Sequence, residues 1–341
     1  MNLTKQEMSS FLTYRMTNPL TTKTTTKVFP NRLPITNSID LEEYLKHRVQ
    51  SITTEADVAL ALSGGIDSAI LAKYMPKGSI AYTFKCIVPG VSVTDESNMA
   101  AKYAEECGLK HRIIEIYWED FEKYSDALMK KKGSPIHSIE VQIYKAALQA
   151  KKDGIHSLIF GEAADAVYGG LSGLLSKDWK IGEFINRYSF LMPFYVLKNP
   201  TLPIEMYKKY ENNGFIDPHE FVSNVFIQES IASYLNACSL AGMNIIMPYP
   251  ETYLNASIDY TRIRDGENKY IVREIFKRLY PGWEIPVKTP MPRPMNEWLK
   301  TWDGPNREEF WDNCVDGLTG DQKWLVWILE RFLNLDSTSK K

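Results

Sequence analysis

Short apolar runs alternate with amphipathic segments along the first half of the chain. Residues 41–49 carry leucine and valine at helical spacing, and residues 57–62 (DVALAL) form an apolar run followed by a turn with two glycines. Such a run is typical of a buried strand. Similar patterns predict strands over residues 79–86, 112–116 and 157–160, and helices over residues 96–107, closed by Gly108, and 141–152. Strands that alternate with helices favour βαβ crossovers, so the sequence predicts an α/β fold with a doubly wound parallel sheet.

The pattern changes after about Gly170. Strand signals fade, and apolar residues follow a helical period as far as the amphipathic segment 322–333. Prolines between residues 281 and 294 predict a long ordered loop. Most of the tryptophans follow residue 280, which favours a helical part packed with aromatic side chains over the alternative of an apolar substrate wall. We expect an N-terminal extension over residues 1–50, then one domain over 51–341, with an α/β core at 51–170 and a mainly helical part at 171–341.

Composition narrows the classes of protein. The 341 residues include 40 Lys and Arg against 42 Asp and Glu, and 44% are apolar, so bulk disorder is excluded. With a net charge of -2, the chain lacks the excess of positive charge that is typical of nucleic-acid-binding proteins, so no nucleic-acid partner is expected. Four scattered cysteines without a CxxC pair argue against disulfides and structural zinc. With no signal peptide and no long apolar stretch, we expect a cytoplasmic protein without membrane contact.

The sharpest chemical signal is a glycine-rich turn between the first buried strand and the next helix. Glycines let backbone N–H groups face one concavity, and the following helix adds its partial positive end, so such a turn suits an anion. The two serine hydroxyls add donors for phosphate oxygens, whereas the aspartate would repel a bare phosphate and favours a bridging divalent cation. The missing Gly-Lys-Ser/Thr ending excludes a Walker A loop, and an ordinary turn is the alternative. The turn reads Ser63-Gly64-Gly65-Ile66-Asp67-Ser68.

A second motif follows the strand predicted over residues 157–160. Residues 160–170 read FGEAADAVYGG and place Glu162 and Asp165 at the carboxyl edge of the same sheet, where open α/β sheets bind their ligands. Asp165 could share a metal ion with Asp67, which would leave Glu162 for proton transfer. From these residues alone, acidic side chains in a surface turn remain the alternative.

Together the two motifs resemble a known family. SGGxDS on a βα turn resembles the PP-loop of the ATP pyrophosphatases, and residues 160–170 resemble the SGEGADELFGG segment of the asparagine synthetase domain. Residues 269–288 look like the family's K-x-x-x-R-E…P…R-x-K segment, and residues 322–333 like its closing tryptophan-rich helix. The resemblance covers nearly the whole chain and implies the adenine nucleotide α-hydrolase-like fold of PP-loop ATP pyrophosphatases with a helical C-terminal part.

The resemblance implies an AMP-forming amide ligase that uses ATP and Mg²⁺. A substrate carboxylate, on a small molecule or a peptide, would be adenylated with release of pyrophosphate and transferred to ammonia or an amine. Glu162 matches the carboxylate that accepts the amine's proton, and Lys288 matches the lysine that stabilises phosphoryl oxygens and the tetrahedral intermediate. A solvated lysine is the alternative for Lys288. Asp67 and Asp165 would hold the metal, and the nucleotide would be bound by Ser63, Gly64, Gly65, Asp67, Ser68 and Gly161.

The sequence also departs from the family pattern. Residue 2 is Asn rather than the Cys of glutamine-using members, and 62 residues precede the loop. The nitrogen would therefore come from free ammonia, from ammonia supplied by a separate protein, or from an amine carried by the substrate, as in the related β-lactam synthetases and lasso-peptide cyclases. Ala166 replaces a glutamate, Pro286 replaces an arginine, and R-x-PFLD is reduced to residues 247–250 (MPYP). Because these changes affect residues that would bind the charged groups of aspartate, we predict that L-aspartate is not the preferred substrate.

Two other functions stay open at this stage. One is a catalytically inactive ATP-binding partner or scaffold, against which the retention of Glu162 and Lys288 speaks. The other is a PP-loop tRNA-modifying enzyme, which would need a basic RNA-binding face or a catalytic CxxC. The sequence has neither a basic excess nor paired cysteines.

Overall fold

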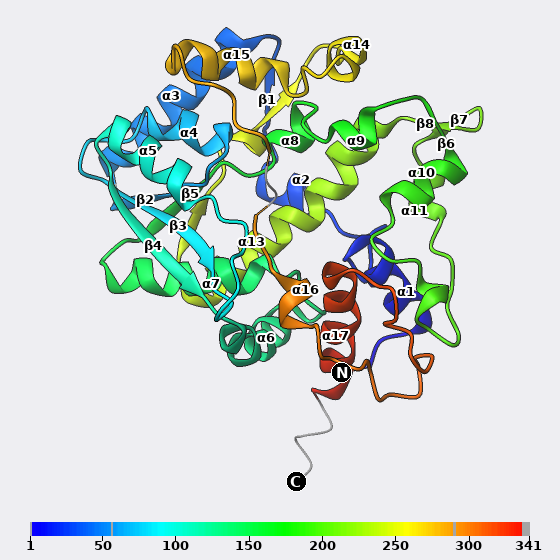
Figure 1. Cartoon of the computed structure of the whole chain (residues 1–341). Helices are drawn as coiled ribbons and strands as arrows, with labels where there is room; N and C mark the ends of the chain where they lie inside the picture. Colours follow the sequence, from blue (N-terminus) through cyan, green and yellow to red (C-terminus); the bar gives the residue numbers. More distant parts are fainter. Residues whose placement is uncertain (1, 56, 289–290, 336–341) are drawn as a thin grey trace.

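A five-stranded parallel sheet lies at the centre of the computed structural model, which describes residues 2–55, 57–288 and 291–335 (Figure 1). Its strand order is β4-β3-β2-β5-β9, and every neighbouring pair is parallel. The strands are β2 (Val58–Ala61), β3 (Ile80–Cys86), β4 (Lys110–Ile116), β5 (Ser157–Phe160) and β9 (Asn244–Ile246).

Helices cover both faces of this sheet. Four of them pack side by side over one face: α3 (Ser38–Glu55), α4 (Ile66–Ala72), α5 (Ser97–Cys107) and α15 (Tyr270–Leu279). The other face is covered by α6 (Trp118–Lys132), α7 (Ile139–Lys152) and α13 (Ile227–Ala241). The predicted doubly wound parallel sheet is therefore confirmed, and Gly108 ends α5 in the left-handed conformation expected of a C-cap (φ 66°).

The strand order creates a switch point between β2 and β5. From β2 the chain proceeds outward through β3 to β4, then returns to the other side of β2 as β5. Loops that leave the carboxyl ends of β2 and β5 therefore turn away in opposite directions and leave a crevice, where ligands of open α/β sheets bind. Residues 63–68 and 161–170 are these two loops.

One hydrophobic core joins the sheet to both ends of the chain. All four residues of β5 are buried, as expected for a central parallel strand. Phe11 and Leu12 of α1 (Lys5–Tyr14) belong to the same core, and so do Trp324 and Leu329 of α17 (Gly320–Asn334), the helix predicted over residues 322–333. Removing these side chains from water is the main force that holds α1 and α17 against the α/β core.

The structure also contains short strands that the sequence pattern did not predict, most of them in the second half of the chain. β9 extends the main sheet, β1 (Leu33–Ile35) pairs with β10 (Thr252–Leu254), and three two-residue strands form a small antiparallel sheet. Strands of two or three residues are too short to show an alternating pattern. The remaining elements are β6 (Trp179–Lys180), β7 (Glu211–Asn212), β8 (Phe215–Ile216), α2 (Thr24–Val28), α8 (Ala164–Val167), α9 (Ser172–Leu175), α10 (Ile181–Tyr188), α11 (Glu205–Lys208), α12 (Pro218–Phe221), α14 (Tyr260–Arg264), α16 (Met295–Trp298), short 3-10 turns at Pro193–Tyr195 and Tyr249–Glu251, and a π turn at Val222–Phe226.

The C-terminal tryptophans pack against one another and against the α/β core. Trp298 and Trp327 contact Trp118 of α6, and Trp324 packs edge-on against Phe121. Residues 289 and 290 of the predicted proline-rich loop lie outside the described residues. Among the described residues, none of the helices is both long and apolar enough to pass through a bilayer.

Candidate functional site

A cavity of about 440 Å³ opens at the carboxyl edge of the sheet, over the switch point. Its walls include the loops that follow β2 and β5, residues 268–269 before α15, and residues 285–288. No tryptophan of the described chain lines it, so the tryptophan-rich part has a packing role rather than forming a wall of this cavity. All nine predicted site residues line the cavity: Ser63, Gly64, Gly65, Asp67, Ser68, Gly161, Glu162, Asp165 and Lys288.

The loop after β2 is folded by its two serines. The hydroxyl of Ser68 accepts a hydrogen bond from the backbone N–H of Ser63 at 3.0 Å, and the hydroxyl of Ser63 accepts one from the N–H of Gly65 at 3.1 Å. The two hydroxyl oxygens are 3.0 Å apart. Both serines thus hold the turn in shape while they border the cavity.

Two glycines allow close packing at this edge of the sheet: Gly161 lies against the loop after β2, and Gly170 lies against Asp165 within the loop after β5. A Cβ atom on Gly161 would lie 2.9 Å from the backbone N of Ser68, and one on Gly170 would lie 1.9 Å from Oδ1 of Asp165. Neither distance is compatible with a side chain, because real Cβ atoms do not approach other atoms so closely. The glycines therefore allow Asp67 and Asp165 to come within reach of one ammonium group.

That ammonium group belongs to Lys269, which sequence reasoning did not assign to the site. Its Nζ lies 2.8 and 2.7 Å from the two carboxylate oxygens of Asp67 and 2.9 Å from Oδ1 of Asp165. The other oxygen of Asp165, Oδ2, accepts a hydrogen bond from Nζ of Lys288 at 2.5 Å. Two carboxylates and two lysines thus form one continuous cluster, in which Lys269 is buried and Lys288 is exposed on the cavity rim.

The backbone at Lys269 is held in an unusual conformation. Its φ is 57°, in the left-handed region that a lysine rarely adopts, and Ala163 has a φ of 69° in the facing loop. The Lys269 N–H donates to the carbonyl of Gly169 at 3.2 Å, and the side chain of Asn268 donates to the carbonyl of Gly170. These bonds fasten the start of α15 to the loop after β5, which is what aims the Lys269 side chain at the two carboxylates.

Charge and burial act in opposite directions in this cluster. Burial disfavours the carboxylate form of Asp165, but Lys269 and Lys288 outweigh it and hold the pKa of Asp165 below its usual value. Burial raises the pKa of Asp67, the charge of Lys269 offsets this rise only in part, and the charge of Asp165 adds to it. The pKa of Lys269 is raised because the two carboxylates outweigh its burial, so Lys269 is an ammonium ion.

Glu162 lies on the other side of the loop after β5, facing α13. Its Oε1 accepts a hydrogen bond from the hydroxyl of Ser230 at 2.6 Å, and Tyr234 one turn further along the helix also bonds to it. Burial, followed by the charge of Glu162, raises the pKa of Tyr234 well above its usual value, so Tyr234 is a hydrogen-bond donor. Two donors from one helix thus orient the carboxylate.

Glu96, at the start of α5, is a further acidic residue on the cavity wall. Its carboxyl accepts a hydrogen bond from the backbone N–H of Gly64, in the loop after β2. Burial raises the pKa of Glu96 to about 7, an effect that this hydrogen bond only partly offsets. Sequence reasoning missed Glu96, Ser230 and Tyr234 because each is brought to the cavity by packing and belongs to neither motif.

The predicted metal site offers two carboxylates, those of Asp67 and Asp165. Within the described residues, no cluster of three or more His, Cys, Asp or Glu side chains could hold a metal ion. Asp67 and Asp165 are nevertheless close enough to share one cation, the ammonium of Lys269. Mg²⁺ is commonly bound by one or two carboxylates together with substrate phosphates and water, so the donor set fits Mg²⁺ only when a nucleotide supplies oxygens.

A doubly wound sheet with a serine-glycine loop and a carboxylate-lysine cluster at its switch point is typical of α/β proteins that bind nucleotides. The family model of asparagine synthase matches residues 40–222, more than half of the chain, and the protein belongs to that family. The family is one of ATP-dependent ligases, and the five-stranded parallel sheet described above confirms the predicted α/β fold. Comparison with curated proteins finds no match.

Similar solved structures share the fold only at a low level. An NH3-dependent NAD synthetase from Campylobacter jejuni has 17% identity and a TM-score of 0.27, with 40% of this chain and 61% of that chain covered. An NMN synthetase from Francisella tularensis has 12% identity and a TM-score of 0.29, with 75% of this chain and 99% of that chain covered. A U34-tRNA thiolase from Methanococcus maripaludis has 17% identity and a TM-score of 0.26, with 73% of this chain and 82% of that chain covered. Scores this low support no argument about function.

Proposed function

We propose that this protein is an AMP-forming amide ligase. It would adenylate a substrate carboxylate with ATP, release pyrophosphate, and transfer the acyl group to ammonia or an amine. The observation that carries the proposal is the cluster of Asp67, Asp165, Lys269 and Lys288 beside the serine-glycine loop, in the same cavity as Glu162. Phosphate handling and proton transfer thus have separate groups within one cavity.

The first step needs positive charge and hydrogen-bond donors around the phosphates. The carboxylate oxygen attacks the α-phosphorus, and the bond from this phosphorus to the oxygen that bridges to the β-phosphate breaks. Pyrophosphate then leaves and carries the negative charge that develops on that oxygen. Ser63, Gly64, Gly65, Ser68 and Gly161 would bind the phosphates through hydroxyl and backbone groups. Lys288, on the rim, would stabilise the phosphoryl oxygens, since an exposed ammonium can leave Asp165 for a stronger anion.

Mg²⁺ would be held by Asp67 and Asp165 together with phosphate oxygens. When bound, the ion would neutralise charge on the phosphates, which is the usual contribution of a metal to phosphoryl transfer. The role of Lys269 is to hold the two carboxylates at one place before the nucleotide arrives, because the buried ammonium contacts both of them.

The second step forms the amide. The amine nitrogen attacks the carbonyl carbon of the acyl adenylate, its N–H proton must leave, and AMP departs from the tetrahedral intermediate. Glu162 would accept that proton, and its hydrogen bonds from Ser230 and Tyr234 would keep the carboxylate pointed at the amine.

Mass spectrometry of the products tests this proposal. Purified protein is incubated with ATP, Mg²⁺, pooled carboxylic acids and hydroxylamine as a general nucleophile, and AMP is distinguished from ADP. AMP together with a hydroxamate is the expected result, lost in Glu162→Gln and Asp67→Ala. Tight ATP binding without AMP would instead favour an inactive partner or scaffold.

L-aspartate provides a narrower test. Because Pro286 and residues 247–250 depart from the family pattern, we expect AMP formation with aspartate and ammonia to be slow compared with another acid from the pool. A rate with aspartate that matches the best other acid would overturn this expectation and leave the ligase proposal intact.

A further inference from the structure

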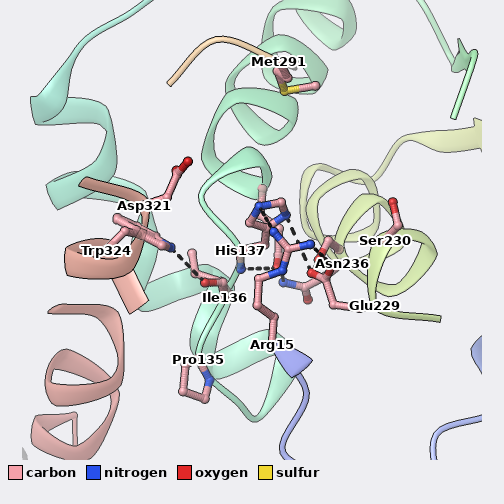
Figure 2. A network of polar contacts seen from close by, with 12 residues as sticks. Arg15, Pro135, Ile136, His137, Glu229, Ser230, Asn236, Met291, Asp321 and Trp324 are labelled. Atoms are coloured by element: carbon pink, nitrogen blue, oxygen red, sulfur yellow. Dashed lines mark hydrogen bonds and ion pairs between the residues drawn. The ribbon is translucent and has the colours of Figure 1, made fainter. Parts of the chain in front are cut away.

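The cavity extends beyond Glu162 to a second group of charged side chains, here called the distal end, formed by Arg15, His137, Glu229 and Arg293. These residues come from four separate segments: the C-cap of α1, the loop before α7, helix α13, and the segment after residue 290. Figure 2 shows Arg15 between His137 and Glu229. None of the four has a role in the ATP chemistry proposed above.

Arg15 and Glu229 form a buried and matched ion pair. Nη2 of Arg15 lies 2.8 Å from Oε2 of Glu229, and the two side chains are 10% and 2% exposed. The guanidinium also stacks on the ring of Phe190, with Cζ 3.7 Å from the ring centroid. The positive charge of Arg15 is therefore largely compensated within the protein.

The same arginine determines which nitrogen of His137 carries the proton. Nη1 of Arg15 is 2.7 Å from Nε2 of His137, and since a guanidinium only donates, Nε2 must accept. The ring is then neutral with its proton on Nδ1, which agrees with the lowered pKa of His137, caused by burial and next by Arg15. Nδ1 has no hydrogen-bond partner among the described residues, and Oε1 of Glu229 is 3.6 Å away. His137, on the cavity wall, therefore has a buried N–H donor without a hydrogen-bond partner.

Arg293 contributes a cation that the protein compensates poorly. Its side chain is 15% exposed, and the one carboxylate that contacts it within the described residues is Asp321, at 3.3 and 3.4 Å. Asp321 is 61% exposed, and a long contact to a solvated carboxylate offsets little charge. With Arg15 paired and His137 neutral, the distal end has one uncompensated positive charge.

Aromatic side chains line the cavity both beside the distal end and beside Glu162. Phe190 and Phe226 lie beside Arg15, whereas Phe160 and Tyr234 pack edge to face near Glu162. A substrate that spans both ends would have an apolar body between two polar groups.

We propose that Arg293 and the Nδ1–H of His137 bind a second anionic group of the carboxylate substrate. The substrate class is then an acid with an apolar body and a further carboxylate or similar anion at its other end. This inference rests on the proposed function for the identity of the reacting group, but the binding site itself does not require turnover. Arg15 is a positioning residue in this arrangement because it acts through His137.

Calorimetric titration of the full chain with diacids tests the inference without catalysis. The probes are adipate, suberate and 1,4-phenylenediacetate, each compared with its monoamide, which keeps one carboxylate and loses the second charge. We expect at least one diacid to bind about 10- to 100-fold more tightly than its monoamide, as for a charged hydrogen-bonded pair. Arg293→Gln should remove this preference, and Arg293→Lys should retain part of it.

Asp321→Asn is the matched control, since it removes the solvated partner of Arg293 and leaves the cation in place. We expect it to keep or increase the preference for the diacid. The inference is overturned if no diacid is preferred by the unaltered protein, including the case in which no probe binds, or if Arg293→Gln keeps the preference. AMP formation is measured separately, so a protein that binds diacids but never forms AMP would contradict only the proposed function.

Discussion

The two ends of the cavity are built in different ways. The end where ATP is proposed to bind, here called the nucleotide end, consists mostly of the loops 63–68 and 161–170 after the neighbouring strands β2 and β5. The matched family region covers both loops. The distal end consists of Arg15, His137, Glu229 and Arg293, and all of these except His137 lie outside the matched region 40–222. The residues proposed for ATP chemistry thus lie mostly in local motifs, whereas the residues proposed for substrate choice are brought together by the fold.

Lys269→Met should give the largest effect, because it removes the cation that both Asp67 and Asp165 contact. Two partly buried carboxylates would lose their main partner, the buried Lys269, and we expect a loss of about 3–5 kcal/mol in the free energy of unfolding. Chemical denaturation measures this loss. Adding Asp67→Asn to Lys269→Met should restore part of the stability by removing one of the unpaired charges. A double variant as unstable as the single one would show that charge compensation is not the cause.

Lys288→Met should separate chemistry from stability at the same end. The side chain is 44% exposed, so we expect a stability change below about 1 kcal/mol. AMP formation should nevertheless fall by about 10²–10³-fold, since a cation aimed at developing negative charge is lost. Lys102→Met, a surface lysine away from the cavity, is the control for removing an ammonium. Equal activity of the two variants would contradict the role proposed for Lys288.

Gly170→Ala tests how tightly the loop after β5 must fold around Asp165. The new Cβ would lie 1.9 Å from Oδ1 of Asp165, so we expect a loss of about 1–3 kcal/mol in stability and weaker ATP binding. Gly182→Ala in α10 is the matched control, because nothing lies within 4 Å of its Cβ position and its backbone is not left-handed. That control should be stabilised by roughly 0.5–1 kcal/mol, since alanine favours a helix. Thermal denaturation and ATP titration compare the two.

Glu96 should cause a smaller, pH-dependent effect at the nucleotide end. Its pKa of about 7 means that it becomes charged beside the Gly64 N–H as the pH rises from 6 to 8, and we expect ATP to bind up to about tenfold more weakly. Because the pKa of Glu96 is raised in the folded state, charging this carboxyl destabilises the fold. This cost is absent below about pH 4.5, grows between pH 4.5 and 7, and is complete above about pH 7. Glu96→Gln should therefore bind ATP independently of pH in this range and be more stable than the unaltered protein at pH 8. An unchanged pH profile in Glu96→Gln would exclude this residue as the cause.

The sequence by itself determined the doubly wound sheet and the nucleotide end. Apolar runs followed by glycine-rich turns mark β2 and β5, and parallel strands bring their carboxyl ends to one edge, so Asp67 and Asp165 could be predicted to lie together. Local spacing was sufficient because each motif contains both its backbone turn and its functional side chains. β9 was missed because three residues are too few to show a period.

Only the tertiary structure decided which cation joins those carboxylates and what lies at the distal end. Lys269 reaches them because α15 is fastened to the loop after β5, and Arg15 meets His137 and Glu229 because α1 packs into the common core. These contacts connect residues more than a hundred positions apart. They are set by the packing of whole helices and by the compensation of buried charge, and even the K-x-x-x-R-E segment that begins at Lys269 does not indicate which carboxylates this lysine contacts.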